Sequence, residues 1–421
     1  MSEAPLREAS ASRPAEDSPT RFFEWGSPGK PIRLAMGETL EHARLAYRTY
    51  GQLNASHSNA VLVFHALTGS HNAAGLMTTV PGVPDLWTAE CHHGWWSEWI
   101  GPGLAIDTNR YFVICANYLG GCYGSTGPSS IDPATGRPWG SRFPRIMLQD
   151  IVDSQMALLD HLGIERLLSV VGASLGGMMA LDVASRYSQR TRGVIPIASG
   201  LRSTMLTRLL NLEQILAIEH DPNFMGGDYY DGQPPHQGMR LARMIAHKSF
   251  ISLHHLEERS GAAIVQQDGD LHWYRMQHQI ESYMLHQGRK FVQRFDANTY
   301  LRLMDAWQAF DLRADARRRG LRNPFETCRN HEFLVFSIDS DVCFYPEEQA
   351  EVVNELKAVG NKPRYVTVHS EKGHDSFLLE CEVYRPHVEY MLSNLLVQAE
   401  AEDATAQRLM QEDTAAHTWF I

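Results

Sequence analysis

The sequence predicts an α/β fold in which a mostly parallel central sheet carries helices on both faces. Apolar, strand-like runs recur along the chain, and helical patterns separate most of them, which is typical of such sheets. These runs lie at 60–66, 111–117, 167–172, 193–199, 332–338 and 364–370. Residues 201–325 interrupt the alternation, because they contain only amphipathic helical patterns. We therefore expect a helical lid inserted between two strands, above the carboxyl edge of the sheet.

These patterns divide the 421 residues into five parts. Residues 31–51 alternate around a Gly-Glu turn and predict an antiparallel hairpin at the edge of the sheet. The predicted parts are a disordered leader at 1–20, the first part of the core at 21–200, the helical lid at 201–325, the second part of the core at 326–398 and an acidic C-terminal tail at 399–421.

Composition and charge exclude several classes of protein. A formal net charge of −11 argues against nucleic-acid binding, which needs a basic surface. The chain has no apolar run long enough to span a membrane, and its N-terminus lacks the apolar segment of a signal peptide. Its six cysteines are scattered and form no C-x-x-C pair. We therefore expect reduced thiols in a cytoplasmic protein, with no metal site.

The segment 172–176 reads Gly-Ala-Ser-Leu-Gly, which is the G-x-S-x-G spacing of a nucleophile elbow. A β-branched run precedes it at 167–171, and a helical pattern begins after it. A sharp turn from strand to helix presents Ser174 as a nucleophile and aims the Leu175 N–H at the oxyanion that develops. The alternative is a glycine-rich turn with an incidental serine, because this short motif also arises by chance.

An acid and a base follow the serine in the order that this kind of sheet requires. Asp339 and Asp341 come directly after the run at 332–338, and His374 follows the run at 364–370. Each lies just beyond the carboxyl end of a strand, where ligands bind in open α/β sheets. The residues alone leave the choice between Asp339 and Asp341 open, since either can instead cap a turn.

A second oxyanion donor is expected from the loop that follows the first strand-like run. The segment 61–75 leads from a strand into a loop that contains glycine, and the Leu67 N–H is our candidate. The alternative is an ordinary exit from a strand. The adjacent His92 and His93 are not expected to bind a metal, because neighbouring side chains rarely converge on one ion.

Longer segments are far more specific than the elbow. They are HALTGS (65–70), NYLGGCYGSTGPSSIDPATGRPWGSRFP (117–144), GASLGGMMAL (172–181), DPNFMGGDYYDGQPPHQGMRLARM (221–244), ESYMLHQGRKFVQRFDANTYL (281–301) and GHDSFL (373–378). Over about residues 20–395 the chain resembles the homoserine O-acyltransferases, and among them the homoserine O-acetyltransferase family, of the α/β-hydrolase superfamily. The resemblance implies an α/β-hydrolase fold and acyltransferase activity.

The resemblance also implies a role for five residues. Ser174 matches the family's nucleophile, Asp341 its acid and His374 its base, which favours Asp341 over Asp339. Arg243 matches the arginine that binds the carboxylate of homoserine, and Asp375 matches the carboxylate that binds its amine. A zwitterionic amino acid needs such a cation at one end and an anion at the other.

The implied reaction is ping-pong transfer of an acetyl group from acetyl-CoA, through an acyl-serine, to the γ-hydroxyl of L-homoserine. This is the first committed step of methionine biosynthesis. Acetyl-CoA is a co-substrate, and no tightly bound cofactor is expected. The resemblance further implies a homodimer joined through the helical lid.

Four alternatives remain beside this interpretation. Relatives that use succinyl-CoA carry an arginine where this chain has Cys343, which favours acetyl. Many relatives carry an arginine at the position of Ile215, so L-serine is kept as an alternative acceptor. An esterase or thioesterase uses the same triad with water, but it does not need the pair formed by Arg243 and Asp375. A non-catalytic interaction protein of this fold typically loses part of the triad.

Overall fold

A computed structural model describes residues 19–260 and 271–417, so most of the expected leader at 1–20 lies outside the described residues. Its centre is an eight-stranded sheet with strand order β1-β4-β8-β5-β11-β12-β13-β14. The strands are β1 (Arg21–Trp25), β4 (Ala43–Tyr50), β8 (Phe112–Ala116), β5 (Ala60–Phe64), β11 (Leu167–Ala173), β12 (Thr191–Ile197), β13 (Glu332–Ile338) and β14 (Arg364–Val368). From β8 to β14 all neighbours pair in parallel, whereas β1 and β4 are antiparallel at one edge.

Each of the six strand-like runs in the sequence forms a strand of this sheet, within two residues at either end. The hairpin expected at 31–51 differs from the prediction. Its first half forms a separate pair, β2 (Ile32–Arg33) and β3 (Thr39–Leu40), while β4 enters the sheet between β1 and β8. All but one of the eight residues of β4 are buried, so this strand needs a neighbour on both sides. The true edge is β1, which precedes the predicted hairpin.

The sheet is buried on both faces because its strands are apolar at successive positions. In β5, residues 60, 62 and 64 pack into one apolar cluster, and residues 61 and 63 pack into a second. Helices α2, α3 and α10 contribute to the first cluster, and α12 contributes to the second. A mostly parallel sheet with helices on both faces confirms the predicted fold class.

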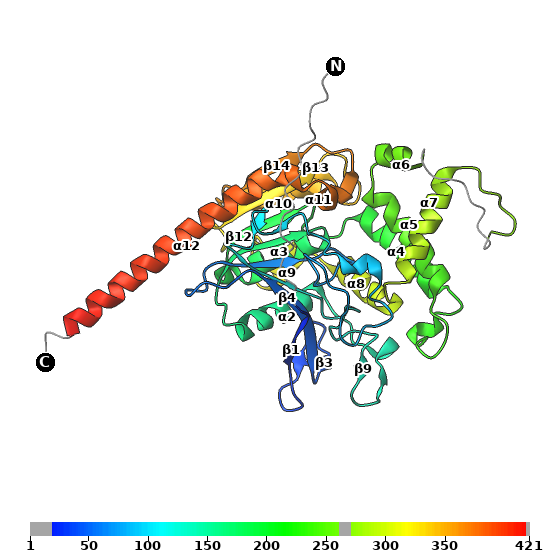
Figure 1. The fold of residues 1–421 in the computed structure, drawn as a ribbon, viewed down its shortest axis with the longest axis horizontal. Helices are drawn as coiled ribbons and strands as arrows, with labels where there is room; N and C mark the ends of the chain where they lie inside the picture. The colour runs from blue at the N-terminus through cyan, green and yellow to red at the C-terminus, as the bar shows by residue number, and fades with distance from the viewer. Residues whose placement is uncertain (1–18, 261–270, 418–421) are drawn as a thin grey trace, which may run out of the picture.

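The core also contains short strands and several helices. The short strands outside the main sheet are β6 (Ile100–Gly101), β7 (Ile106–Asp107), β9 (Ile131–Asp132) and β10 (Arg137–Pro138). The helices that lie before β12 or after β13 are α1 (Ala89–His92), α2 (Leu148–His161), α3 (Leu175–Arg186), α10 (Pro346–Ala358), α11 (Ser376–Leu379) and α12 (Cys381–His417). Residues 399–417 of the expected tail continue α12, which leads away from the body of the molecule in Figure 1.

Helices fill the connection between β12 and β13, and the described residues there form no strand. They are α4 (Met205–Glu219), α5 (His236–Phe250), α6 (Leu253–Ser260), α7 (Gln279–Val292), α8 (Ala297–Ala309) and α9 (Leu312–Arg318). Figure 1 shows α4, α5, α6 and α7 grouped at one side of the molecule. We call residues 201–325 the lid. None of the helices in 19–260 and 271–417 is both long and apolar enough to cross a bilayer.

A buried carboxylate organises the lid where it meets the core. Asp296 caps α8 by accepting a hydrogen bond from the Thr299 N–H, and it also accepts from the hydroxyls of Tyr229 at 2.6 Å and Tyr230 at 3.0 Å. A buried carboxylate is stable only when its oxygens are satisfied in this way. The loop before α5 is thereby fastened to the start of α8.

Candidate active site

Ser174 occupies the turn between β11 and α3 in a strained conformation. Its φ is 58° and its ψ is −127°, values that cost a residue with a side chain about 1–3 kcal/mol. The surroundings hold this conformation, because the Ser174 N–H donates to Ile197 O at 2.9 Å and the Ser199 hydroxyl donates to Ser174 O at 2.8 Å. Such strain persists only where neighbouring structure determines it.

Glycines make the turn possible by allowing close approach of the backbone. A Cβ on Gly172 would lie 2.2 Å from the carbonyl oxygen of Gly176, and a Cβ on Gly176 would lie 2.5 Å from that of Phe64. No side chain fits at either distance. The first turn of α3 therefore packs directly against the end of β5, which brings the serine next to the loop that follows β5.

Asp341 and His374 form a close pair at the carboxyl ends of β13 and β14. His374 Nδ1 lies 2.6 Å from Asp341 Oδ2, while Asp341 Oδ1 accepts the backbone N–H groups of Cys343 at 2.7 Å and Phe344 at 3.0 Å. Asp339 instead contacts the exposed His369 at 2.8 Å. The structure thus brings Asp341, and not Asp339, to the imidazole.

The surroundings of His374 fix both its orientation and its charge. Phe344 stacks on the imidazole at 5.5 Å between ring centres, and Phe377 meets it edge-on at 5.3 Å. Burial alone lowers the pKa of His374, but the charge and hydrogen bond of Asp341 outweigh burial, so the pKa lies above its ordinary value. A carboxylate on Nδ1 leaves Nε2 as the nitrogen that can accept a proton.

One cavity of about 190 Å³ collects most of the residues predicted for the site. It is lined by Ala66, Leu67, Thr68, Gly69, Trp95, Ser174, Arg243, Phe250, Arg294, Trp307, His374, Asp375, Phe377 and Leu378. Among the described residues His374 Nε2 is buried without a hydrogen-bond partner, so it does not bond the Ser174 hydroxyl here. Such contacts often tighten only in the complex with substrate.

The two expected oxyanion donors are backbone N–H groups beside this cavity. Leu67 lines it, and Leu175 is the first residue of α3, directly after the serine. Within the described part of the chain, neither N–H donates a hydrogen bond. A helix N-terminus leaves such donors unpaired and places partial positive charge at them. Both N–H groups are thus available to a developing negative charge.

Arg243 reaches the cavity from α5 and is held by aromatic rings. Its guanidinium carbon lies 5.4 Å from the ring centre of Phe250 and 5.0 Å from that of Phe291. Burial and then the charge of Arg294 lower the pKa of Arg243. It makes no hydrogen bond or ion pair with any described residue, whereas Asp375 lines the same cavity. The cavity therefore carries a cation with unused N–H donors and, elsewhere on its wall, a carboxylate.

Sequence reasoning missed Arg294, which also lines the cavity. This residue lies in the segment 281–301 that supports the resemblance, but neither its spacing nor its surroundings in the sequence indicated a role. The aromatic wall formed by Trp95, Phe250 and Trp307 was missed as well. These side chains come from a loop and two lid helices, so only the folded chain shows that they meet.

The two residues that bear on substrate choice lie in other cavities. Cys343 lines a void of about 10 Å³ whose described walls carry no charged side chain. Leu67, Phe250 and Trp307 line both this void and the cavity at Ser174. Ile215 instead lines a separate cavity with Glu219 and Arg302, so it does not shape the wall at Ser174.

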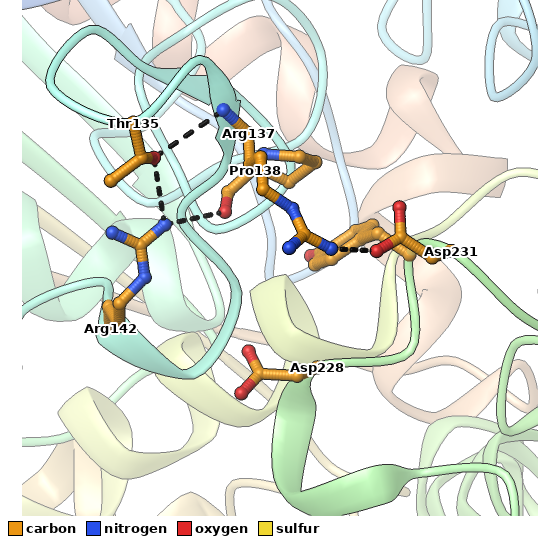
Figure 2. Close-up of a pocket in the computed structure, with 7 residues that line it drawn as sticks. Thr135, Arg137, Pro138, Arg142, Asp228 and Asp231 are labelled. Carbon is orange, nitrogen blue, oxygen red and sulfur yellow. Dashed lines mark hydrogen bonds and ion pairs between the residues drawn. The ribbon is translucent and has the colours of Figure 1, made fainter.

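A larger cavity, of about 400 Å³, lies between the β9–β10 hairpin and residues 228–231. Its charged groups are already paired. Figure 2 shows Arg137 directed to Asp231, and Arg142 directed to the Thr135 hydroxyl and the Pro138 carbonyl. Asp228 accepts from Ser141. The described residues of this cavity of about 400 Å³ include no activated nucleophile, so the cavity is not a candidate catalytic centre.

Comparisons with known proteins agree with this geometry. The family model for the alpha/beta hydrolase fold matches residues 59–380. The solved structure of esterase E22 is 26% identical with a TM-score of 0.78, covering 89% of this chain and 100% of that one. The molecule is thus an α/β hydrolase in fold, with a serine-type site.

The sequence narrows this class further. A homoserine O-acetyltransferase from Mesorhizobium japonicum is 40% identical over 378 residues, which are 90% of this chain and 94% of that protein. The crystal structure of homoserine O-acetyltransferase from Bacillus anthracis is 26% identical with a TM-score of 0.76, covering 89% of this chain and 98% of that one. The chain belongs to the homoserine O-acetyltransferase family, a family of acyltransferases, and the family predicted from the motifs is confirmed.

Proposed function

We propose that this chain transfers an acetyl group from acetyl-CoA to the γ-hydroxyl of L-homoserine through an acetyl-Ser174 intermediate. The observation that carries the proposal is the content of one cavity. Ser174 and His374 meet there with a guanidinium, Arg243, and a carboxylate, Asp375. Neither His374 Nε2 nor Arg243 has a hydrogen-bond partner among the described residues. The pair of Ser174 and His374 suits acyl transfer, and the other pair suits an amino-acid acceptor.

In the first half-reaction, His374 Nε2 takes the proton of the Ser174 hydroxyl as its oxygen attacks the thioester carbonyl. The oxyanion that forms accepts hydrogen bonds from the N–H groups of Leu67 and Leu175. The intermediate collapses as the carbon–sulfur bond breaks, and the CoA sulfur leaves with the proton from His374. Asp341 stabilises the imidazolium throughout but does not take its proton.

In the second half-reaction, the acetyl group passes from Ser174 to homoserine. The carboxylate of homoserine binds Arg243 and its ammonium binds Asp375, which directs the γ-hydroxyl towards the acetyl-serine. His374 removes the hydroxyl proton, the oxygen attacks the acetyl carbonyl, and Ser174 leaves with the proton returned by His374. The product is O-acetyl-L-homoserine, which is the basis for proposing a place early in methionine biosynthesis.

The void beside Cys343, which adjoins the cavity at Ser174, favours acetyl over succinyl as the acyl group. A succinyl chain ends in a carboxylate that needs a cation, and the void beside Cys343 is small and has no charged wall among the described residues. Of the two cavity arginines, Arg294 is already bonded to protein groups. L-Serine remains an alternative acceptor, since its shorter side chain keeps the same zwitterionic ends.

Hydrolysis is the competing function, because esterase E22 shares this fold. Water needs no clamp for a carboxylate and an amine, so Arg243 and Asp375 favour transfer. The lid supports transfer as well, since α5, α8 and the connection between α7 and α8 supply residues that line the cavity at Ser174. Covering an active site in this way favours an acceptor other than water. All six cysteines are free thiols, which is compatible with the cytoplasmic location that we propose.

A homodimer through the lid is part of the proposal. Helix α4 exposes Met205, Leu209, Leu212 and Leu216 at helical spacing, which forms an apolar stripe along one face. Neighbouring α5 adds the exposed Leu241. A stripe of this kind is self-complementary and costs solubility when it is left in water. We therefore assign this face to a second copy of the chain, and sedimentation velocity measures whether it forms.

A CoA-release assay tests the function by crossing two donors, acetyl-CoA and succinyl-CoA, with three acceptor conditions: homoserine, serine and none. We expect steady turnover only with acetyl-CoA and homoserine, and a single turnover without an acceptor. Mass spectrometry should then show acetyl on Ser174. The control Ser174→Ala should form no adduct and lose activity by about 10⁴-fold or more. Steady CoA release without an acceptor, or an adduct on the variant, contradicts the proposal.

A further inference from the structure

We propose that Arg294 is a positioning residue that ties the lid to the loop carrying the Leu67 oxyanion donor. We call residues 65–70 the oxyanion loop. The inference rests on the proposed function and deepens it, because it assigns a role to a partly buried lid cation that the mechanism above does not use. Its basis is a set of hydrogen bonds among Arg294, Thr68 and Tyr123.

Most carbonyl groups of the oxyanion loop accept a hydrogen bond, each from a different donor. Four of them accept hydrogen bonds: His65 O from the Tyr118 hydroxyl, Ala66 O from the Gly69 N–H at 3.0 Å, Thr68 O from Arg294 Nη1 at 3.1 Å, and Ser70 O from Trp95 Nε1 at 2.9 Å. Three of the donors belong to the core or to the loop itself. Among the residues that the structure describes, Thr68 O, one residue after Leu67, is the carbonyl of this loop that is held from the lid.

Arg294 is itself fixed in place. The Tyr123 hydroxyl donates to the carbonyl oxygen of Arg294 at 2.5 Å and accepts from its Nη1 at 3.2 Å. Glu90 lies 3.9 Å from Nε, and the Phe291 ring lies 5.4 Å below the guanidinium carbon. Burial alone lowers the pKa of Arg294, but Tyr123, Cys91 and Glu90 together raise it above its ordinary value. The guanidinium is therefore a permanently charged, rigid donor.

A fixed Thr68 carbonyl matters because an oxyanion donor acts only when it is already in place. The Leu67 N–H must lie within hydrogen-bond distance of an oxygen that becomes negative only in the transition state. Thr68 O and the Gly69 N–H belong to one peptide group, and this N–H holds Ala66 O, whose own peptide group carries the Leu67 N–H. Releasing Thr68 O lets the first peptide rotate and so loosens the second, and a displacement of about 1 Å can cost about 10²-fold in rate. Because Arg294 belongs to the lid, a displaced lid would also loosen the oxyanion loop.

Direct binding of substrate is the alternative role for Arg294, since its side chain lines the cavity. The hydrogen bonds favour positioning. Nη1 of Arg294 already donates to two protein oxygens, whereas Arg243 donates to none of the described residues. A substrate carboxylate therefore finds unused donors on Arg243. The two roles differ in kinetics, because binding affects the KM for homoserine and positioning affects the rate of acetylation.

The test compares Arg294→Met and Arg294→Lys with the matched control Lys290→Met. Lys290 contacts the same Glu90 at 2.7 Å but does not line the cavity. Rapid-quench mass spectrometry with acetyl-CoA alone measures acetylation of Ser174. We expect Arg294→Met to slow it about 10- to 100-fold with the KM for homoserine within about twofold. Arg294→Lys should recover part of the rate through one donor to Thr68 O, and Lys290→Met should match the unaltered enzyme.

Acetylation within twofold of normal in Arg294→Met, or a raised KM for homoserine with acetylation intact, overturns the inference. If Arg294→Met does not fold, Tyr123→Phe removes the hydroxyl that holds Arg294 and should slow acetylation about three- to tenfold. No change in that variant equally overturns the role. Failure of the proposed function is separate, because it appears as absence of any acetyl-serine in the unaltered enzyme.

Discussion

The two halves of the cavity are built by different means. On the core side, turns of the backbone at strand ends place Ser174 and His374, and they leave the N–H groups of Leu67 and Leu175 without a partner in 19–260 and 271–417. On the lid side, long side chains reach in from helices or from the connection between helices, as Arg243 and Arg294 do. In the proposed reaction, the core half contains the groups that make and break bonds, while the arginines of the lid half supply positive charge.

This difference indicates how each half responds to change. The backbone of the core half is tightly packed, because a Cβ at Gly172 or Gly176 would collide with neighbouring backbone atoms. The lid half depends on side-chain contacts, which can be altered one at a time. Substitutions of Asp341 or His374 should therefore affect both half-reactions, and substitutions of Arg243 should affect only the acceptor step.

The largest effect in this comparison is expected for Asp341→Asn. The amide cannot stabilise the imidazolium, so acetylation of Ser174 should slow by about 10³- to 10⁴-fold in single-turnover assays. The matched control is Asp339→Asn, which alters a carboxylate that contacts the exposed His369 instead. That control should stay within about twofold. Equal losses of acetylation rate in both variants would show that Asp341 is not the acid that acts on His374.

A smaller and more selective effect is expected for Arg243→Met. Loss of a charge-assisted hydrogen bond should lower kcat/KM for homoserine about 10- to 100-fold, because the acceptor carboxylate loses its partner. Acetylation in the absence of acceptor should remain within about threefold. Arg243→Lys keeps the charge but not the planar fork and should fall between the two. A matching collapse of acetylation would show that the two halves are not separable.

The smallest effect concerns the pH dependence of acetylation. His374 must be neutral to act as a base, and its raised pKa means that the rate is high at alkaline pH and falls as pH drops through a value above the ordinary 6.5. Stopped-flow measurement of CoA release from pH 5 to 9 records this fall in rate, which we call the acidic limb of the pH profile. Asp341→Asn should move it to lower pH, because the carboxylate is the main group that raises the pKa.

A substitution of Glu348 is expected to have a smaller effect on the pH at which the acetylation rate falls. Burial and the nearby Asp341 raise the pKa of Glu348 to about 8, so this carboxyl is largely protonated at neutral pH. Glu348→Gln should therefore shift the limb by less than about half a pH unit, towards lower pH. A larger shift would mean that Glu348 carries its charge near neutrality.

The sequence was most informative where local pattern determines structure. All six strand-like runs became strands because each is apolar enough to be buried on both faces. The edge was predicted incorrectly, since alternation within residues 31–51 does not reveal that β1 pairs with β4 from outside that segment. Pairing partners depend on the whole sheet, and a local pattern contains no such information.

The site shows the same division. The elbow at Ser174 was predictable because its spacing encodes a turn, and His374 because it follows a strand. Asp339 and Asp341 could not be separated by position, since both follow the same strand and only contacts distinguish them. Arg294 could not be found at all by local reasoning, because the Thr68 carbonyl that it binds lies 226 residues away in the sequence.

The order of the parts along the chain has a consequence for synthesis on the ribosome. Ser174 and the sheet around it emerge early, but the strand β14 and the imidazole after it are among the last described elements before α12. A nascent polypeptide that stops short of residue 373 therefore displays a hydroxyl with nothing to activate it. If the proposed mechanism holds, the order of translation keeps the unfinished enzyme from reacting, and truncated products should be inert.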